Sequence, residues 1–246
     1  MNSLIKDKIK AASIHLLISL FLALICFLLV YLVWYPSPLV TATGVGGLFL
    51  MMLGIDLVLG PAFTFIVYKK FKKTLKFDLC VIAIIQLSAM IYGVYSMYEG
   101  RPVWIAFAGD RFELIKANDI VDSDVNYEST IKNSSFGPKY IFVDMKLAPT
   151  QKLDMMLKEA QYGISPVQRM EYYKPFELAT LEIRAHAQPL SILKEFNNPH
   201  QINSVLSQYP QATAWLPLKA NAVDMVVLIN QKRDEVIKIV DLRPWN

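Results

Sequence analysis

Cysteine and histidine are scarce in this sequence, and the common catalytic motifs are absent from it. The 246 residues include two cysteines, Cys26 and Cys80, and both lie in long apolar runs. The polar second half therefore has no disulfide framework and no cysteine nucleophile. The chain has three histidines, no HExxH motif, no Gly-x-Ser-x-Gly motif and no phosphate-binding glycine loop followed by Lys and Ser or Thr. We therefore expect no enzymatic activity, no metal and no cofactor.

Charge is also scarce, but only in the first part of the chain. Residues 1–99 carry 12 of the 46 Asp, Glu, Lys and Arg residues, and residues 100–246 carry the other 34. The first part has a net charge of +4 and the second part is neutral, so the basic character of the chain belongs to the first part. A neutral polar half without a stripe of Lys and Arg argues against nucleic-acid binding. The contrast predicts two domains, 1–99 and 100–246, in different solvents.

Three apolar runs in the first domain are long enough to span a membrane. Residues 14–34 contain no charged side chain and would form a helix about 31 Å long. A cleaved signal peptide is the competing interpretation, but its apolar core is normally about 7 to 15 residues long. The second run, 45–68, is interrupted by Asp56 and by Gly60-Pro61, and the third run, 79–98, is uncharged. We predict a bundle of three transmembrane helices.

The lysines predict the direction of these spans. Three precede the first run and five lie between the second and third runs, whereas residues 35–44 carry no charge. The excess of lysine places the N-terminus in the cytoplasm and residues 100–246 outside. The lysines need no role beyond setting this topology, although binding of anionic lipids is a natural by-product. They are Lys6, Lys8, Lys10, Lys69, Lys70, Lys72, Lys73 and Lys76.

Asp56 is the most informative residue of the apolar part. A carboxylate near the middle of a span costs about 2.5 to 3.5 kcal/mol on insertion scales, so it needs a partner or a proton. Gln86 and Ser88 of the third run are closest in depth, and Thr64 lies two turns along the same helix. Gly60-Pro61 predicts a kink or a close helix contact one turn away. Asp56 therefore locks the three helices together, contacts a partner helix, or conducts protons or ions, for which a single acid makes a poor pathway.

The second domain alternates short strands with helices. Strands at both ends of a helical middle predict an α+β domain whose mainly antiparallel sheet joins the first hairpin to the last strands. Arg101-Pro102 and Arg243-Pro244-Trp245 stand at the two ends, and we expect the sheet to bring them together. The expected strands are 103–107, 111–115, 140–147, 214–218, 224–230 and 235–242, the expected helices are 150–162, 176–187, 190–196 and 199–209, and the expected loop is 119–135.

A series of short motifs resembles the type IV pilin accessory proteins called TfpX and TfpZ. The resemblance runs nearly the whole chain in order, and it implies a protein of the inner membrane of a Gram-negative bacterium with a periplasmic second domain. It implies assistance in the production or display of a type IV pilin and transfers no catalytic residue. The motifs are Trp34-Tyr35-Pro36-Ser37-Pro38-Leu39, Asp56-Leu57-Val58-Leu59-Gly60-Pro61, Lys76-Phe77-Asp78-Leu79, Gln86-Leu87, Tyr92-Gly93, Arg101-Pro102-Val103, Asp110-Arg111-Phe112, Leu216-Pro217, Asp224-Met225 and Asp241-Leu242-Arg243-Pro244-Trp245.

We therefore expect a non-enzymatic accessory factor for type IV pilin. In this hypothesis the helices contact the pilin helix, and the exported sheet contacts the pilin head through a membrane-proximal face. The expected partners are the major pilin and membrane lipids, with the pilus assembly machinery and a second copy of the chain left open. A membrane-anchored enzyme that modifies pilin or a lipid-linked precursor, and a small subunit of an envelope or transport complex, are the alternatives. The candidate partner-binding residues are Asp56, Gly60, Pro61, Gln86, Arg101, Asp110, Arg111 and Trp245.

Overall fold

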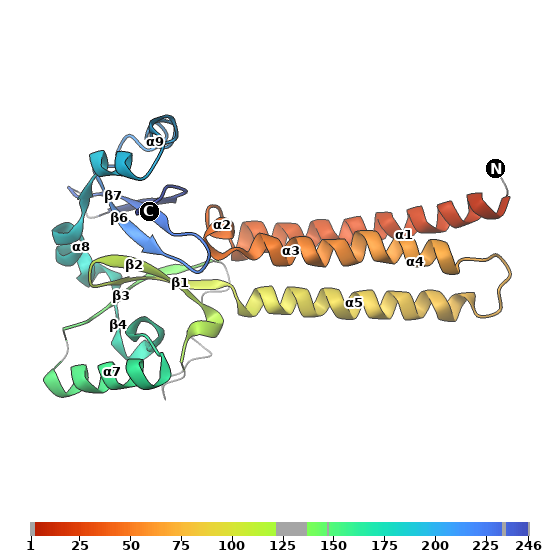
Figure 1. Ribbon diagram of the computed structural model, residues 1–246, viewed down its shortest axis with the longest axis horizontal. Coiled ribbons are helices and arrows are strands. Elements are labelled where there is room, and N and C mark those ends of the chain that lie inside the picture. Colours follow the sequence, from red (N-terminus) through yellow and green to blue (C-terminus); the bar gives the residue numbers. More distant parts are fainter. Residues whose placement is uncertain (1–2, 122–136, 147, 233–234, 246) are drawn as a thin grey trace. The chain divides into compact units, whose positions relative to one another are not determined.

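A computed structural model describes residues 3–121, 137–146, 148–232 and 235–245 (Figure 1). The chain divides into two compact units. The helical unit comprises residues 1–33 and 45–99, and the sheet unit comprises residues 34–44 and 100–246. Most of the expected loop 119–135 lies outside the described residues.

Three helices in the described part of the chain are long and apolar enough to cross a membrane. The first begins at Ser3 rather than at residue 14, because lysine is a good helix former and the helix continues through the charged N-terminal turns. The middle helix packs against both of the others. The helices are α1 (Ser3–Leu28) with the π-helical turn η1 (Leu29–Trp34), then α3 (Val45–Gly54), η2 (Ile55–Leu59) and α4 (Gly60–Val67) in succession, and α5 (Leu75–Glu99).

The irregularity expected at Gly60-Pro61 is a π-helical turn, η2 (Ile55–Leu59), in the middle helix. Pro61 has no N–H group, so a regular α-helix would leave the carbonyl group of Leu57 without its usual donor. A wider turn before the proline changes the local hydrogen-bond pattern, and such turns occur often at functional sites. Asp56 lies within this turn and is buried there.

The two groups of lysines lie at the same end of the helical unit. Lys8 in α1 donates a hydrogen bond from Nζ to the carbonyl oxygen of Ile66 at 3.1 Å, and its Nζ lies 5.5 Å from the centre of the Phe65 ring. Both partners belong to the last turn of α4, directly before the loop that carries the other lysines. The unit is therefore basic at one end.

The sheet unit contains an eight-stranded mixed sheet, not the mainly antiparallel sheet that the sequence predicts. The strand order is β4-β3-β1-β2-β6-β7-β8, and β5 pairs with β6. The pairs β1–β3 and β2–β6 are parallel because long connections return the chain in the same direction, while the other pairs are antiparallel. The strands are β1 (Pro102–Ala108), β2 (Arg111–Lys116), β3 (Lys139–Val143), β4 (Tyr173–Lys174), β5 (Gln188–Pro189), β6 (Ala214–Lys219), β7 (Met225–Asn230) and β8 (Glu235–Val240).

Both faces of the sheet are covered. In β7, Met225, Val227 and Ile229 belong to a cluster on one face, whereas Val226 and Leu228 belong to a cluster on the other. This alternation follows from the two-residue period of a strand, and a strand with apolar side chains on both faces marks the middle of a three-layer fold. The covering helices are α7 (Pro149–Tyr162), η6 (Phe176–Ala179), α8 (Thr180–His186), η7 (Leu190–Glu195) and α9 (Pro199–Leu206).

The short segment between the first two apolar helices forms part of the sheet unit. It contains the helix α2 (Leu39–Thr43), whose Leu39 and Ala42 are buried in the cluster on one face of the sheet. The carbonyl oxygen of Ala42 accepts hydrogen bonds from the backbone N–H groups of Ala222 at 2.9 Å and of Val223 at 3.2 Å. The sequence indicated only an uncharged connection here.

Candidate functional site

Asp56 lines a pocket within the helical unit. Its side chain is 7% exposed, and the pocket beside it has a volume of about 230 Å³. Residues from all three apolar helices form the walls, and most of them are apolar. The lining residues are His15, Ile18, Ser19, Leu22, Asp56, Ala83, Gln86, Leu87 and Met90.

Gln86 is the predicted neighbour of Asp56, and its side chain bonds to the backbone of Asp56. Its Nε2 donates a hydrogen bond to the carbonyl oxygen of Asp56 at 3.2 Å. Because that carbonyl can only accept, the bond orients the amide and leaves Gln86 Oε1 free. Within the described part of the chain, Oε1 of Gln86 and Oδ1 of Asp56 are both buried and accept no hydrogen bond. Two residues that line the pocket, Asp56 and Gln86, therefore each keep one acceptor oxygen that receives no hydrogen bond from the described residues.

Gly60 allows Gln86 to approach the middle helix. A Cβ atom at position 60 would lie 2.1 Å from Nε2 and 2.6 Å from Oε1 of Gln86, which is far closer than atoms can pack. Glycine at this helical position therefore provides space rather than conformational freedom. Gly60 and Pro61, two of the candidate residues, shape the site from the turn after Asp56.

Two other expectations about this site have different outcomes. Ser88 is exposed and is not among the residues that line the pocket. The expectation that Ser88 could be a partner of Asp56 is therefore wrong. Thr64 instead bonds to His15, whose Nδ1 lies 2.6 Å from Thr64 Oγ1. Sequence reasoning did not include His15 or Ser19 in the site, although their spacing of four residues places both on one face of α1.

In the sheet unit, one candidate residue of the proposed membrane-proximal face, Arg101, lies apart from the other three. Arg101 comes directly before β1 and its side chain is 1% exposed, so it presents no surface to a partner. Asp110 and Arg111 lie at the opposite end of the hairpin, where Ala108 pairs with Arg111 while Pro102 pairs with Lys116. The grouping of Arg101 with these residues is therefore wrong in geometry.

Arg111 and Trp245 do come together, with Asp110 and Asp224 beside them. The guanidinium carbon of Arg111 lies 5.9 Å from the centre of the Trp245 ring, and Arg111 Nε is 2.8 Å from Asp110 Oδ1. Trp245 donates a hydrogen bond from Nε1 to Asp224 Oδ2 at 2.8 Å. Asp224 Oδ1 also accepts from the backbone N–H of Ala220 at 2.8 Å. This group connects the C-terminal residues to the sheet.

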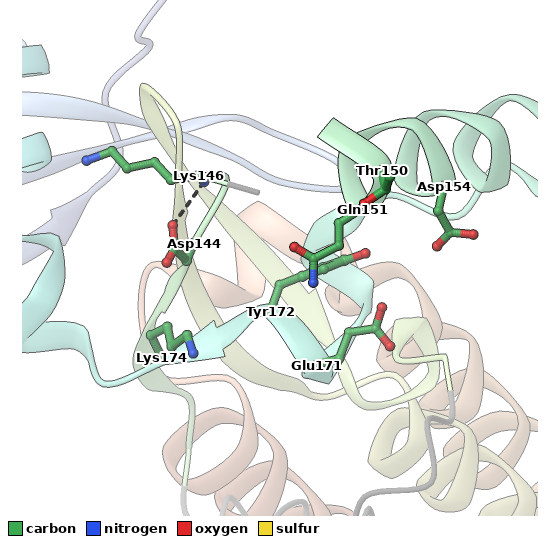
Figure 2. A pocket seen from close by; sticks show the side chains of 8 residues that line it. All are labelled: Asp144, Lys146, Thr150, Gln151, Asp154, Glu171, Tyr172 and Lys174. Atoms are coloured by element: carbon green, nitrogen blue, oxygen red, sulfur yellow. Dashed lines mark hydrogen bonds between the residues drawn. The ribbon is translucent and has the colours of Figure 1, made fainter. Parts of the chain in front are cut away.

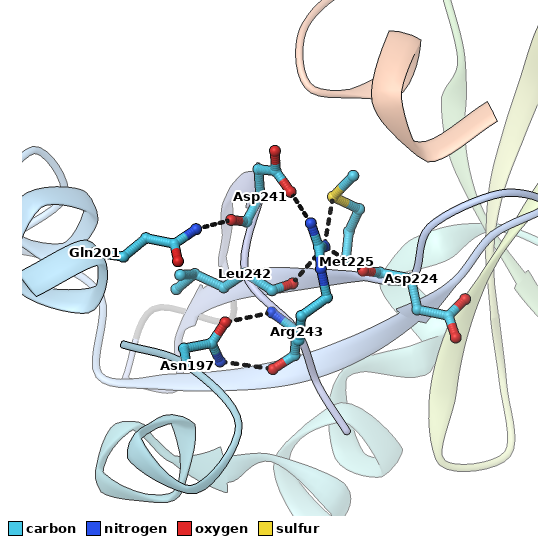
Figure 3. Close-up of polar contacts among 7 residues, drawn as sticks. All are labelled: Asn197, Gln201, Asp224, Met225, Asp241, Leu242 and Arg243. Atoms are coloured by element: carbon cyan, nitrogen blue, oxygen red, sulfur yellow. Dashed lines mark hydrogen bonds and ion pairs between the residues drawn. The ribbon is translucent and has the colours of Figure 1, made fainter. Parts of the chain in front are cut away.

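Figure 3 shows further contacts that hold the chain before Trp245 in place. The side chain of Asn197 accepts a hydrogen bond from the backbone N–H of Arg243 at 2.7 Å and donates one to its carbonyl oxygen at 2.8 Å. The guanidinium of Arg243 pairs with Asp241 and donates to the carbonyl oxygen of Asp224. These contacts are internal, so they explain a fixed C-terminal segment without requiring a partner.

A larger polar cavity of about 560 Å³ lies beside α7 (Figure 2). Bonding to Lys158 lowers the pKa of Asp154, and bonding to Glu182 raises the pKa of Lys146. Both shifts favour the ordinary charged forms, so neither group is tuned as an acid or base near neutral pH. Among the described residues, no group of three His, Cys, Asp or Glu side chains could hold a metal ion. The cavity is lined by Asp144, Lys146, Thr150, Gln151, Asp154, Glu171, Tyr172 and Lys174.

Comparison with known proteins identifies the chain as a bacterial fimbrial assembly protein. Residues 3–44 match the family model described as fimbrial assembly protein FimB. Over 115 residues the chain is 40% identical to the fimbrial assembly protein of serogroup I and 39% identical to that of serogroups C1 and C2, both from Dichelobacter nodosus. No solved structure matches this chain.

The chain belongs to this family of fimbrial assembly proteins. The matched segment covers 46% of this chain and 87% of the protein of serogroups C1 and C2. It covers 44% of the serogroup I protein, so the chain spans less than half the length of that relative. The resemblance to pilin accessory proteins, based on motifs alone, is confirmed at the level of a type IV pilus accessory family.

Proposed function

We propose that this protein is a non-enzymatic accessory factor of the bacterial inner membrane that assists assembly or display of type IV pili by contacting the pilin directly. Membership of the fimbrial assembly family supports a role in fimbrial biogenesis. The observation that supports direct contact is the Asp56 pocket between apolar helices, where the buried Oδ1 of Asp56 accepts no hydrogen bond from the described residues. A group that only locked its own helices together would meet its donors within the chain.

The proposed orientation follows from the charges and from chain connectivity. The N-terminal lysines and the lysine loop lie at one end of the helical unit, which we assign to the cytoplasm. The first and third helices run away from that end and lead directly into the sheet unit, at residues 34 and 100. Both connections therefore leave the membrane on one side, and we assign the sheet unit to the periplasm.

In this arrangement, the helical unit receives the apolar helix of a pilin that waits in the membrane. Association of helices in lipid gains little from the hydrophobic effect, so packing and hydrogen bonds between helices determine the contact. A polar group at membrane depth is accordingly a site of function more often than of packing. The sheet unit, which we assign to the periplasm, is then free to contact the pilin head or the assembly machinery.

The first test compares variants of Asp56 in the host bacterium. We expect Asp56→Asn, which keeps the size of the side chain, to reduce the number of surface pili by at least about tenfold, the effect of roughly 1.4 kcal/mol lost from the contact. The level of the protein should stay unchanged, as measured by immunoblot. Ser88→Ala is the matched control, because Ser88 lies on the third helix outside the pocket. Normal piliation of Asp56→Asn at normal abundance would contradict the proposal.

Photocrosslinking identifies the partner. A photoreactive residue at Leu87, in the pocket wall, should trap the major pilin, while the same probe at Val58, which is exposed and outside the pocket, should not. Trapping of the assembly machinery alone would move the function to regulation of that machinery. Crosslinks between copies of this chain alone would return Asp56 to a structural role. An altered mass of pilin in a deletion strain would favour the enzymatic alternative.

A further inference from the structure

The two unpaired atoms in the Asp56 pocket define what kind of group would complete it. Asp56 Oδ1 and Gln86 Oε1 are acceptors, both are buried, and neither receives a hydrogen bond from the described residues. While Asp56 is ionised, a group that pairs with both atoms must therefore supply two hydrogens, and a ligand that offers only acceptors would leave both atoms unsatisfied. A buried unsatisfied acceptor costs about 1 to 3 kcal/mol.

The charge of the lining sets a second condition. Asp56 is the only acid among the nine lining residues, and no Lys or Arg lines the pocket. The other titratable side chain is His15, and its Nδ1 is engaged with Thr64 at 2.6 Å. A carboxylate in such surroundings is stabilised by an opposite charge far more than by a neutral donor, because the low polarity strengthens the attraction.

The remaining walls set the third condition. Ile18, Leu22, Ala83, Leu87 and Met90 surround the polar end with apolar side chains. The volume of about 230 Å³ is several times the roughly 30 Å³ that one water molecule occupies in the liquid. The pocket therefore has room for a group larger than one water molecule, and its walls suit a charged nitrogen on an apolar stem.

We propose that this pocket binds a positively charged nitrogen with at least two N–H donors, such as a primary ammonium group, presented on an apolar helix of the partner. One N–H donates to Asp56 Oδ1 and another donates to Gln86 Oε1. The identity of the partner as pilin rests on the proposed function, whereas the chemistry of the pocket rests on its two acceptors. Gly60 contributes by leaving the space that Gln86 occupies.

A binding assay on the purified full-length protein in a nonionic detergent tests this chemistry. Cys26 is buried in the helical unit and Cys80 is exposed, so a Cys80→Ser background leaves one thiol whose exposure on heating reports the opening of this unit. The probes are octylammonium, octyltrimethylammonium, which keeps the charge without N–H groups, and octanol, which is neutral. Of the three probes, we expect only octylammonium to raise the temperature at which half of the Cys26 thiol becomes exposed. The rise should be several degrees and should saturate with octylammonium concentration.

Variants and outcomes complete the test. Asp56→Asn and Gln86→Leu should remove or greatly weaken the response to octylammonium, and Ser88→Ala should respond as the parent protein does. An equal response to octyltrimethylammonium or octanol, a full response of Asp56→Asn, or no response to any probe would overturn the inference.

The assay separates this inference from the proposed function. A positive amine response together with normal piliation of Asp56→Asn would leave the ammonium site standing and reject its role with pilin. Loss of pili without an amine response would leave the accessory role standing and reject the ammonium as the recognised group.

Discussion

Two buried or partly buried aspartates, one in each unit, have opposite surroundings. Asp224 in the sheet unit accepts hydrogen bonds from Ala220 N and from Trp245 Nε1, so its own chain supplies a donor to each oxygen. Asp56 in the helical unit is 7% exposed, and its Oδ1 accepts none from the described residues. The first carboxylate stabilises a fold, whereas the second keeps an oxygen that the described residues leave without a hydrogen bond.

This difference predicts opposite consequences of mutation. Removing a satisfied buried group leaves its former partners unpaired and lowers stability. Removing an unsatisfied buried charge takes away a group that was costly to bury, so stability is kept while binding is lost. Variants of the helical pocket should therefore affect pili, and variants of the C-terminal network should affect unfolding.

The largest effect in this comparison is expected for Gly60→Ala. The added Cβ would lie 2.1 Å from Gln86 Nε2, so the Gln86 side chain must leave its position and the pocket must change shape. We expect surface pili to fall by about tenfold, as for Asp56→Asn, which corresponds to roughly 1.4 kcal/mol. Gly54→Ala is the matched control, because it lies in the same helix and its Cβ would meet no atom within 4 Å. Equal numbers of surface pili in the two variants would contradict the expectation that piliation depends on the shape of the pocket.

A smaller effect, on stability, is expected for Asp224→Ala. The variant leaves Ala220 N and Trp245 Nε1 without their acceptor, which should lower the free energy of unfolding by about 2 to 3 kcal/mol. All four tryptophans lie in the sheet unit, so their fluorescence during denaturation of the full-length protein reports this unit. Asp110→Ala should change stability by less than about 0.5 kcal/mol, because Asp110 is exposed and pairs only at the surface. A similar loss in both variants would show that Asp224 has no special role.

The smallest effect is expected for Glu113→Gln and depends on pH. Burial raises the pKa of Glu113 above its ordinary value of 4.5, and the nearby Lys219 opposes this shift. The folded state then binds the proton more tightly than the unfolded state, so stability falls as the pH rises from about 4.5 through the raised pKa. Gln removes this loss, and the variant should unfold at a slightly higher temperature than the parent at pH 7.

The control for this prediction is the same pair of proteins at about pH 3, well below the ordinary value of 4.5, where both states of the parent hold the proton and the difference should nearly vanish. Glu235→Gln, at an exposed position of β8, should leave the midpoint of thermal unfolding unchanged at both pH values. A variant of Glu113 that is less stable than the parent at pH 7 would show that the attraction to Lys219 outweighs the cost of burial.

Sequence reasoning located what depends on local pattern. Apolar run length predicted the three helices, and the two-residue alternation with the turn at Gly109 predicted the hairpin β1–β2. Asp56 and Gln86 could be paired because helix rise converts sequence position into depth. The helix expected at 199–209 is α9, and Asn198 caps its start by accepting a hydrogen bond from His200 N at 2.8 Å.

The remaining features depend on contacts between distant residues. The parallel pairing of β2 with β6 joins Phe112 to Leu218, and no periodicity reveals such a register. Arg101 is buried, and the length of the hairpin separates it from Arg111. The Arg-Pro sequence that Arg101 shares with Arg243 does not reveal either fact. The bond from His15 to Thr64 also joins residues 49 positions apart.

The segment 34–44 has a consequence for biogenesis. Leu39 and Ala42 leave the ribosome long before the strands they are buried against, so the core of the sheet unit stays incomplete until the third helix has been inserted. In the proposed topology, a chain whose third helix fails to insert separates residues 100–246 from two of their core side chains. The core of the sheet unit then closes only around a correctly threaded chain, in which Ala42 accepts hydrogen bonds from Ala222 and Val223.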